Sequence, residues 1–523
     1  MYKRGLLLII AILIGGMMIL PAEAQEGEHI EIQKDEDVYA GITKGEFIST
    51  LVEMMGWNSQ GQVQDMEEYI YLANQHGLGL NPEEDFNGDI SKQDATYILI
   101  RSMGYDPLEK EINLLHSPFD DLVIDSSKPA QTIIMEMYEK LIAPIEGLHG
   151  FYAIKSYAQR DFIPQLDGVN FGWSRLEFND ESNKIDLKVD EKNHFHIPEK
   201  FSEVTEKAKQ NNISKHLMIF ASQFTKDEAG IGIVEHIIAN NEAQEAIIQQ
   251  IIEHVNGIEK YGEQAEFDGV VIDFEDIREE VLAEKFNLFL RALKDELDES
   301  NKKLYVTVPP RKYYKGYDYK TIGEITDGVI LMAHDYYEKN ADSIKLSNEM
   351  QSFYKIKTPL TPIENIHNKG FDLYHALKDI TDEATGIRDK HKIYLQISFD
   401  VAQWRGIEEA GEIKIWREQP TYDAVKKRIQ NEGSKQDLQM HYDKRFENPY
   451  LTYYDAESDI HNILWYEDTR SVLTKINLAK LFGIKNISLW RLGNIPGYDQ
   501  ENEKFMYLDT WQQILKQHHK DAN

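Results

Sequence analysis

The stretch Phe267-Asp268-Gly269-Val270-Val271-Ile272-Asp273-Phe274-Glu275 is a short apolar run that carries two carboxylates near its end. A run of this length predicts a strand buried on both faces, as in a parallel sheet, rather than a helix. Side chains alternate along a strand, so Asp273 and Glu275 share one face with Val271, whereas Phe274 faces a packing layer. Burying two neighbouring carboxylates is costly unless their pKa values move or they are hydrogen-bonded. The arrangement therefore favours an active site at the end of this strand.

Similar apolar runs recur along the chain, and helical patterns separate most of them. The candidate strands cover residues 150–154, 168–171, 216–221, 267–274, 304–308, 328–332, 393–397 and 487–490. Helical patterns include 247–259 and 283–299. This alternation predicts an α/β fold, a (β/α)8 TIM barrel. A doubly wound open sheet is the alternative, but no glycine-rich phosphate turn follows the first strand, which counts against its nucleotide-binding forms. The long gap at 402–464, with a helical pattern at 421–431, predicts a small α/β insertion between strands seven and eight.

Catalytic groups of such a barrel lie at the C-terminal ends of its strands. Asp335 ends the sixth candidate strand and Trp490 ends the eighth, so three carboxylates converge with aromatic rings. Acids can protonate a glycosidic oxygen and flat rings can stack on sugars, so this set suits a sugar substrate. His334 is the histidine near these carboxylates, and we interpret it as a packed or substrate-contacting ring, not as a metal ligand. No Gly-x-Ser-x-Gly motif of a serine hydrolase is present.

These segments resemble the family 18 glycoside hydrolases, the chitinase-like barrels. Residues 268–275 resemble the family's strand-four motif, residues 332–336 its strand-six segment, and residues 465–475 with 489–490 the run into its last strand. The likeness spans about residues 148–516, leaving a tail at 517–523. Residues 151–152, 308–310 and 490–493 favour the spore- and cell-wall-lytic branch over true chitinases.

The resemblance implies a role for each matching residue. Glu275 would be the general acid, and Asp273 would orient the substrate's own 2-acetamido group, which replaces an enzyme nucleophile. The expected substrate contacts are Asp335, Tyr336, His334, Trp490 and Tyr152. No cofactor or metal is expected.

Two positions depart from the family pattern. Val271 stands where the family usually has Asp or Asn, a group that relays charge behind Asp273, and His334 stands where Tyr is usual. The first change is expected to lower activity or shift its pH optimum, and the second bears on acetamido binding.

The N-terminal part contains an internal repeat. Residues 42–57 align with 90–105, and Thr43 with Glu46 and Ser91 with Asp94 have the spacing of capping boxes, so each copy predicts a helix start. A third, weaker unit is expected at 119–141. The repeats resemble the S-layer homology domain, which implies an all-α repeat domain at 25–147 that binds cell-wall polysaccharide. Lys44 and Lys92 occupy the motif's basic position. The alternative is a helical repeat with capped helices and no wall binding.

Composition limits the remaining possibilities. A chain of 523 residues with 41% hydrophobic and 11% aromatic residues predicts two or three globular domains. Its 90 acidic and 57 basic residues give a net charge of -33, which disfavours nucleic acid. Residues 1–24 have the charged, apolar and Ala-x-Ala parts of a secretory signal, with an uncleaved membrane anchor as the alternative. The chain has no cysteine, which excludes disulfides and thiolate sites and fits export by a Gram-positive bacterium.

Together these features predict a secreted, cell-wall-associated, monomeric hydrolase of β-1,4-linked N-acetylglucosamine polymers, peptidoglycan or chitin-like, with no membrane contact after signal cleavage. A barrel of the same family that has lost most turnover and binds wall carbohydrate is the alternative, motivated by Val271 and His334. A purely structural S-layer component is less favoured, because it gives no reason for paired carboxylates at a strand end.

Overall fold

A computed structural model describes the chain from residue 38, with gaps at 55–56, 59–62, 64, 77, 92–93, 96–97, 99–100, 103–130, 133, 136–142, 154, 180–181, 183, 348, 364–369, 430–434, 444–445, 499–506 and 519–523. The chain divides into two compact units, Met1–Ala143 and Pro144–Asn523. The predicted signal at 1–24 lies outside the described residues. Within the described residues, no helix combines the length and the apolar character that crossing a membrane requires.

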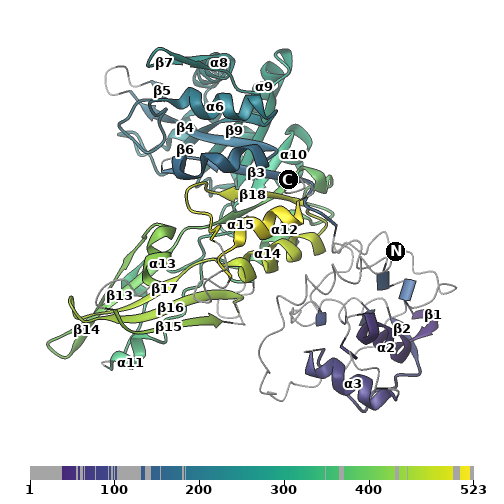
Figure 1. The fold of residues 1–523 in the computed structure, drawn as a ribbon. Helices are drawn as coiled ribbons and strands as arrows, with labels where there is room; N and C mark the ends of the chain where they lie inside the picture. Colours follow the sequence, from purple (N-terminus) through teal and green to yellow (C-terminus); the bar gives the residue numbers. More distant parts are fainter. Residues whose placement is uncertain are drawn as a thin grey trace. The chain divides into compact units, whose positions relative to one another are not determined.

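The larger unit is a closed barrel of parallel strands (Figure 1). Among the described residues its eight strands are β3 (Gly147–Tyr152), β4 (Gly168–Phe178), β6 (Ser214–Ser222), β9 (Gly269–Glu275), β10 (Lys303–Val308), β11 (Gly328–Leu331), β12 (Ile393–Ser398) and β18 (Asn486–Trp490). Pairing of β3 with both β18 and β4 closes the sheet. The predicted (β/α)8 barrel is confirmed, and the closure excludes an open doubly wound sheet. Each predicted strand is present, with ends within three residues of the prediction except in β4, which continues seven residues beyond the predicted end at 171.

Strand β9 follows the alternation that its sequence predicts. Phe274 points outward and stacks on Phe286 and Phe289 of helix α9 (Ala283–Glu299), with ring centroids 6.0 and 5.3 Å away. Val271 points inward and is fully buried with Phe151, Met218 and Ile330. These contacts fix the strand's register, because a slip of one residue would move the carboxylates into the helix layer.

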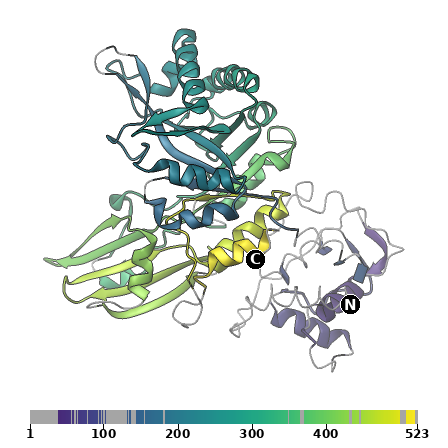
Figure 2. The same ribbon diagram turned by 45° about the horizontal axis from the view of Figure 1, so that its top comes forward.

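Helices lie around the outside of the sheet (Figure 2), and their buried side chains are mainly apolar. They are α6 (Phe201–Gln210), α7 (Ile233–Ala239), α8 (Asn241–Asn256), α9, α10 (Tyr319–Ile325), α12 (Leu373–Ile380), α14 (Thr469–Leu481) and α15 (Thr510–Gln517). The short helix α11 (Met350–Phe353) lies instead beside the insertion described below (Figure 1). Short 3₁₀ segments lie at Ser156–Gln165, Glu280–Leu282, Ala341–Ser343 and Lys390–Lys392, and small strands at β5 (Ile185–Lys188), β7 (Ile258–Lys260) and β8 (Glu263–Ala265). Asp468 and Ser471 form a reciprocal capping box that begins α14.

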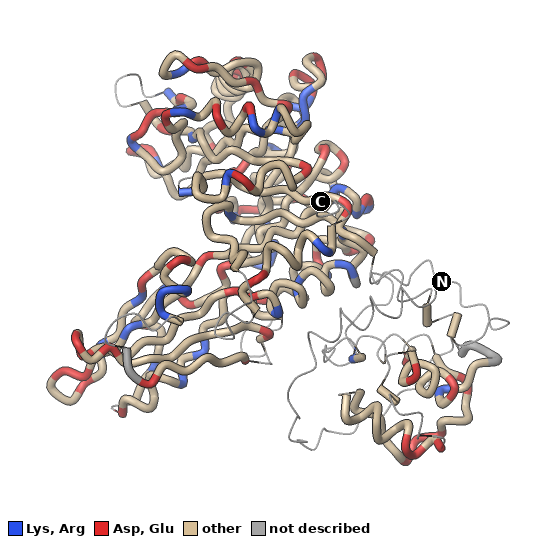
Figure 3. The backbone as a smooth tube through the Cα atoms, in the orientation of Figure 1, with Lys and Arg blue, Asp and Glu red and all other residues tan. Residues whose placement is uncertain are grey.

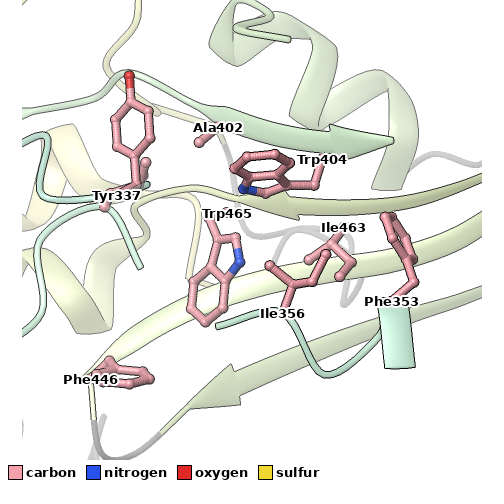
Figure 4. Close-up of a cluster of buried hydrophobic side chains, with 9 residues drawn as sticks. Tyr337, Phe353, Ile356, Ala402, Trp404, Phe446, Ile463 and Trp465 are labelled. Atoms are coloured by element: carbon pink, nitrogen blue, oxygen red, sulfur yellow. The ribbon is translucent and has the colours of Figure 1, made fainter. Parts of the chain in front are cut away.

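The predicted insertion between the seventh and eighth barrel strands is present. It is an antiparallel sheet of β13 (Ala402–Glu409), β14 (Glu412–Glu418), β15 (Lys435–Asp443), β16 (Asn448–Asp455) and β17 (Ile460–Trp465), with helix α13 (Tyr422–Ile429). Tyr337 and Phe353, from the segment after β11, pack against Trp404 of β13 and Trp465 of β17 (Figure 4). This apolar cluster packs the segment after β11 against the insertion, so the two form one continuous unit.

The described part of the smaller unit contains β1 (Val38–Thr43), α2 (Lys44–Met54), α3 (Met66–Gln75) and β2 (Asp89–Ser91). Both predicted helix starts have their caps: the hydroxyl of Thr43 accepts from the backbone N–H of Glu46 at 3.1 Å, and that of Ser91 from Asp94 at 2.9 Å. The strands just before the two helix starts pair antiparallel, so the unit is not purely helical as the sequence suggested. The third repeat expected at 119–141 lies largely outside the described residues.

Candidate active site

The predicted carboxylates gather at the C-terminal end of the barrel. Glu275 is the last residue of β9, and Asp335 lies just beyond the end of β11. Both line a cleft of about 620 Å³, together with His334, Tyr336 and residues of the loop after β10. Asp276 and Asp335 have positive φ values of 67° and 60°. Such φ values are uncommon outside glycine and are often found at functional sites, where the surrounding structure holds them.

Asp273 lies directly behind this cleft, inside the barrel. It is only 5% exposed, and its Oδ1 accepts a hydrogen bond from the Thr307 hydroxyl at 2.5 Å. Burial raises the pKa of Asp273 to about 6, although the hydrogen bond from Thr307 favours the ionised form. Val271 lies two residues before Asp273 on the same face of β9. It packs among apolar side chains and offers Asp273 no hydrogen bond.

Glu275 has the environment of a proton donor. Burial raises its pKa well above the usual range of a glutamate, and the negative charges of Asp273, Asp276 and Asp335 add to this rise. Taking a carboxyl out of water disfavours its charged form, and a second carboxylate nearby does the same. Glu275 can therefore hold a proton near neutral pH and present it to the cleft.

His334 and Asp335 form a charged pair beside Glu275. The His334 Nδ1 lies 3.5 Å from Asp335 Oδ2, and its Nε2 lies 2.6 Å from the Gln396 amide oxygen, which can only accept. Burial opposes protonation of His334, but Asp335 outweighs it and raises the pKa of the histidine. Burial likewise opposes ionisation of Asp335, and His334 outweighs it and lowers the pKa of this aspartate. In the described part of the chain, no group of three or more acidic or histidine side chains is arranged to hold a metal ion.

Tyr336 offers an unused hydroxyl to the cleft. Its hydroxyl oxygen is buried and, among the described residues, has no hydrogen-bond partner. A buried hydroxyl without a partner is costly, so a ligand that supplies a partner would be stabilised there. Trp490 lies half-buried at the end of β18, with its ring edge-on to Phe151 at 5.4 Å. The expected contact between the Trp490 ring and a bound sugar stays a prediction.

Tyr152 does not belong to this group, which corrects the sequence-based expectation. Its side chain is 3% exposed and packs against Phe171 and Trp173, with ring centroids 5.7 and 5.9 Å away. The neighbouring Phe151 points into the barrel. Alternation along β3 therefore turns Tyr152 outward, away from the cleft.

Sequence reasoning missed three polar residues around the carboxylates. Thr307 was detectable as a hydroxyl within an apolar strand, two positions after Tyr305 on the same face. Asp276, which accepts from the Ser222 hydroxyl at 2.8 Å, follows the recognised motif directly. Gln396 gave no signal, because its contact with His334 joins β12 to the segment after β11.

The two lysines expected to bind wall polymer lie in the smaller unit. Lys44 is 5% exposed, and its ammonium pairs with Glu84 at 2.5 Å and with Asp94 at 3.4 Å. The resemblance implies that the Lys44 ammonium binds the wall polymer, but here two carboxylates of the protein already neutralise it. Lys92 lies outside the described residues.

Comparisons with known proteins agree with this geometry. Residues 148–494 match the model of the family described as Glycosyl hydrolases family 18. The chain is 25% identical over 280 residues to the cortical fragment-lytic enzyme of Bacillus subtilis (strain 168), which covers 52% of this chain and 54% of that protein. The enzyme of the same name from Bacillus anthracis is 25% identical over 310 residues, covering 56% and 61%. The chain thus spans between half and two thirds of the length of these curated relatives.

A solved structure, the group IV chitinase of Ostrinia furnacalis, superposes with a TM-score of 0.52 at 15% identity, covering 71% of this chain and 99% of that one. At this identity the likeness shows the fold alone. The family match, in contrast, runs from the first barrel strand to the residues after the last, over more than half of the chain. The chain therefore belongs to the family 18 glycosyl hydrolases.

Proposed function

We propose that the protein is an exported, cell-wall-associated enzyme that cleaves β-1,4-linked polymers containing N-acetylglucosamine. The single observation that carries this proposal is the position of Glu275, a carboxyl with a raised pKa that opens onto a cleft in front of the buried Asp273. An acid near neutrality with a second carboxylate behind it suits cleavage of a glycosidic bond.

The proposed reaction is substrate-assisted and retains the anomeric configuration. Glu275 gives its proton to the glycosidic oxygen while the oxygen of the substrate's 2-acetamido group attacks the anomeric carbon, so the glycosidic bond breaks as the new bond forms. Asp273 would orient the acetamido group and balance the positive charge that develops on it. Water then attacks the same carbon and returns its proton to Glu275, which restores the enzyme.

Peptidoglycan is the favoured polymer. The relatives that support it are named cortical fragment-lytic enzymes. The predicted signal at 1–24 supports export. The resemblance of the N-terminal repeats to S-layer homology domains supports attachment to the wall, through groups other than Lys44, which is paired with Glu84 and Asp94. In the cleft, the paired His334 and Asp335 and the unpartnered Tyr336 hydroxyl are the groups proposed to hold the acetamido group.

A specific observation favours a second candidate function, a wall lectin with weak turnover. Val271 replaces the relay group that the family usually places behind Asp273, and it is packed among apolar side chains. Asp273 then depends on Thr307 for its hydrogen bond. The two candidates differ in turnover and agree in binding.

The test is to incubate purified protein with peptidoglycan and with N-acetylglucosamine oligomers and to identify new reducing ends by mass spectrometry. We expect N-acetylglucosamine ends, with the β-anomer formed first when the products are followed by NMR. Release of the α-anomer first would contradict the substrate-assisted route. Binding without new reducing ends from either polymer would select the lectin.

A further inference from the structure

Three cationic side chains border the catalytic end of the barrel and form no ion pair with the described residues. Arg278 follows β9, Lys312 follows β10 and Lys339 follows β11. Lys312 and Lys339 line the cleft, and Arg278 lies beside Tyr314, another lining residue. All three are exposed, and among the described residues none of them has a carboxylate within ion-pair distance. We call these residues the cleft cations.

Acidic partners are abundant in this chain, so their absence at the cleft cations is informative. The sequence has 90 acidic and 57 basic residues, and positions of Asp and Glu are spread over the barrel helices and the insertion (Figure 3). Neighbouring cations do pair: Lys357, which also lines the cleft, lies 2.9 Å from Asp443, and Arg311 pairs with Asp379. Lys357 and Arg311 are each neutralised by a carboxylate of the protein, whereas none of the cleft cations forms an ion pair among the described residues.

Each cleft cation instead lies against aromatic rings. The Lys312 ammonium is 5.8 Å from the Tyr313 ring and 5.6 Å from the Phe371 ring, and these two rings lie 4.3 Å apart. The Lys339 ammonium is 5.6 Å from the Tyr337 ring. The Arg278 guanidinium lies between Phe224 and Tyr314, at 5.2 and 5.3 Å. Tyr313 and Phe224 are 44% and 59% exposed, so their rings are open to stacking by a sugar.

The acidic floor of the cleft offsets this positive rim only in part. Asp276 and Glu338 also line the cleft. Lys339 is near enough to Glu275 and Asp335 to favour their charged forms. Glu275 has a raised pKa because of burial and its neighbouring carboxylates, so it is neutral when it serves as an acid. Asp335 is compensated by His334 at 3.5 Å. Positive charge that is not held in an ion pair among the described residues therefore lies along the rim, with Lys312 farther from the floor carboxylates' influence than Lys339.

We propose that Lys312 and Lys339, extended by Arg278, bind carboxylates carried by the glycan, so that the substrate class is a carboxylated amino-sugar polymer and not neutral chitin. The inference rests on the proposed function in taking this cleft as the glycan site. In peptidoglycan, alternate sugars carry a lactyl carboxylate, which bears either a free charge or a stem peptide with its own carboxylates. Both sources offer the same chemistry to an ammonium, namely a charge-assisted hydrogen bond beside a stacked ring.

The experiment measures binding on a Glu275→Gln background, where turnover cannot distort affinity. The ligands are peptidoglycan glycan strands freed of peptides, the same strands with their carboxylates amidated, strands with intact stem peptides, and N-acetylglucosamine oligomers of equal length. The variants are Lys312→Gln, Lys339→Gln and both together. Lys315→Gln is the matched control, because Lys315 lies on the same loop as Lys312 but lines a separate pocket between α9 and α10.

We expect free-carboxylate strands to bind more tightly than amidated strands, with a preference that weakens as salt rises. Each single variant should reduce this preference by about threefold and the double variant by about tenfold, as expected for partly exposed charge pairs. The control should keep the wild-type preference. A preference confined to strands with stem peptides would place the recognised carboxylate on the peptide.

Equal affinity for free and amidated strands, or an equal loss on both in the variants, would overturn the inference. So would a failure to bind any of the strands. The proposed function fails by a different readout, the absence of new reducing ends with wild-type protein, so the two outcomes are separable.

Discussion

The hydroxyl of Thr307 on β10 lies 2.5 Å from Oδ1 of Asp273 on β9, and it is the side-chain donor that Asp273 has among the described residues. The family usually supplies a polar side chain at the position of Val271 below this aspartate, and here that position is part of an apolar cluster. We infer that Thr307 is a positioning residue: its hydrogen bond fixes the orientation of the Asp273 carboxylate and favours its ionised form.

Replacing Thr307 by valine removes this donor while keeping the side chain's shape. Hydrogen bonds to charged groups contribute about 1.5–3 kcal/mol, so we expect kcat to fall by about tenfold or more. Because the hydrogen bond lowers the pKa of Asp273, its loss raises that pKa, and the acidic limb of the pH–rate profile should move up by about one unit.

The conservative change Thr307→Ser is the control, since it keeps the hydroxyl and should restore both kcat and the acidic limb. If Thr307→Val changes only thermal stability, and kcat and the pH profile stay as in the wild type, Thr307 has a structural role alone.

The pH dependence of the wild-type enzyme follows from the two buried carboxyls. Burial raises the pKa of Asp273 to about 6, and activity should fall as pH drops through this value because Asp273 loses its charge. Burial and nearby carboxylates raise the pKa of Glu275, so activity should persist at neutral pH and fall as the pH rises through this higher value. The apparent pKa values belong to the pair, because the two groups interact. Full activity well below the pKa of Asp273 would contradict this account, as would a profile with no basic limb.

A substitution at Tyr336 tests whether its hydroxyl, which lies at the cleft, binds substrate. Because its oxygen has no hydrogen-bond partner among the described residues, Tyr336→Phe should leave the free energy of unfolding unchanged or slightly raised. If the hydroxyl binds substrate, the same variant should raise KM by about fivefold to tenfold, the effect of losing one hydrogen bond. Urea unfolding and steady-state kinetics measure the two quantities. An unchanged KM would remove Tyr336 from the substrate contacts.

The buried pair of Glu467 and Lys475 is structural, although it lies in a segment that resembles the family. Its side chains are fully buried, the ion pair measures 2.7 Å, and the Ser471 hydroxyl donates to the same carboxylate at 2.5 Å. Lys475→Met leaves a buried carboxylate without its partner and should cost about 3–5 kcal/mol in urea unfolding.

The double variant Glu467→Gln with Lys475→Met should recover part of this loss, because it also removes the unpaired charge. An equal loss in the single and double variants would mean that the packing of Lys475, and not its charge, stabilises α14.

The sequence predicted those features that depend on local patterns. All eight barrel strands were found because each is a buried run with recognisable ends, and alternation within β9 placed Asp273 and Glu275 on one face. Tyr152 was named as a substrate contact from the family resemblance, but it follows the inward-facing Phe151 on β3, and neighbours on a strand point in opposite directions. Thr307 and Gln396 were missed because their roles arise from pairing between strands distant in sequence. The β1–β2 pair was missed because two short strands separated by helices carry little periodicity.

The most direct test of the central claim is the rate of sugar release from peptidoglycan by wild-type protein and by Glu275→Gln, with polymer binding measured in parallel. Glutamine keeps the size of the side chain and cannot donate the proton that the leaving oxygen needs. Loss of release by at least about a thousandfold, with binding retained, is the predicted result. Release by Glu275→Gln at the wild-type rate would contradict the assignment of Glu275 as the catalytic acid.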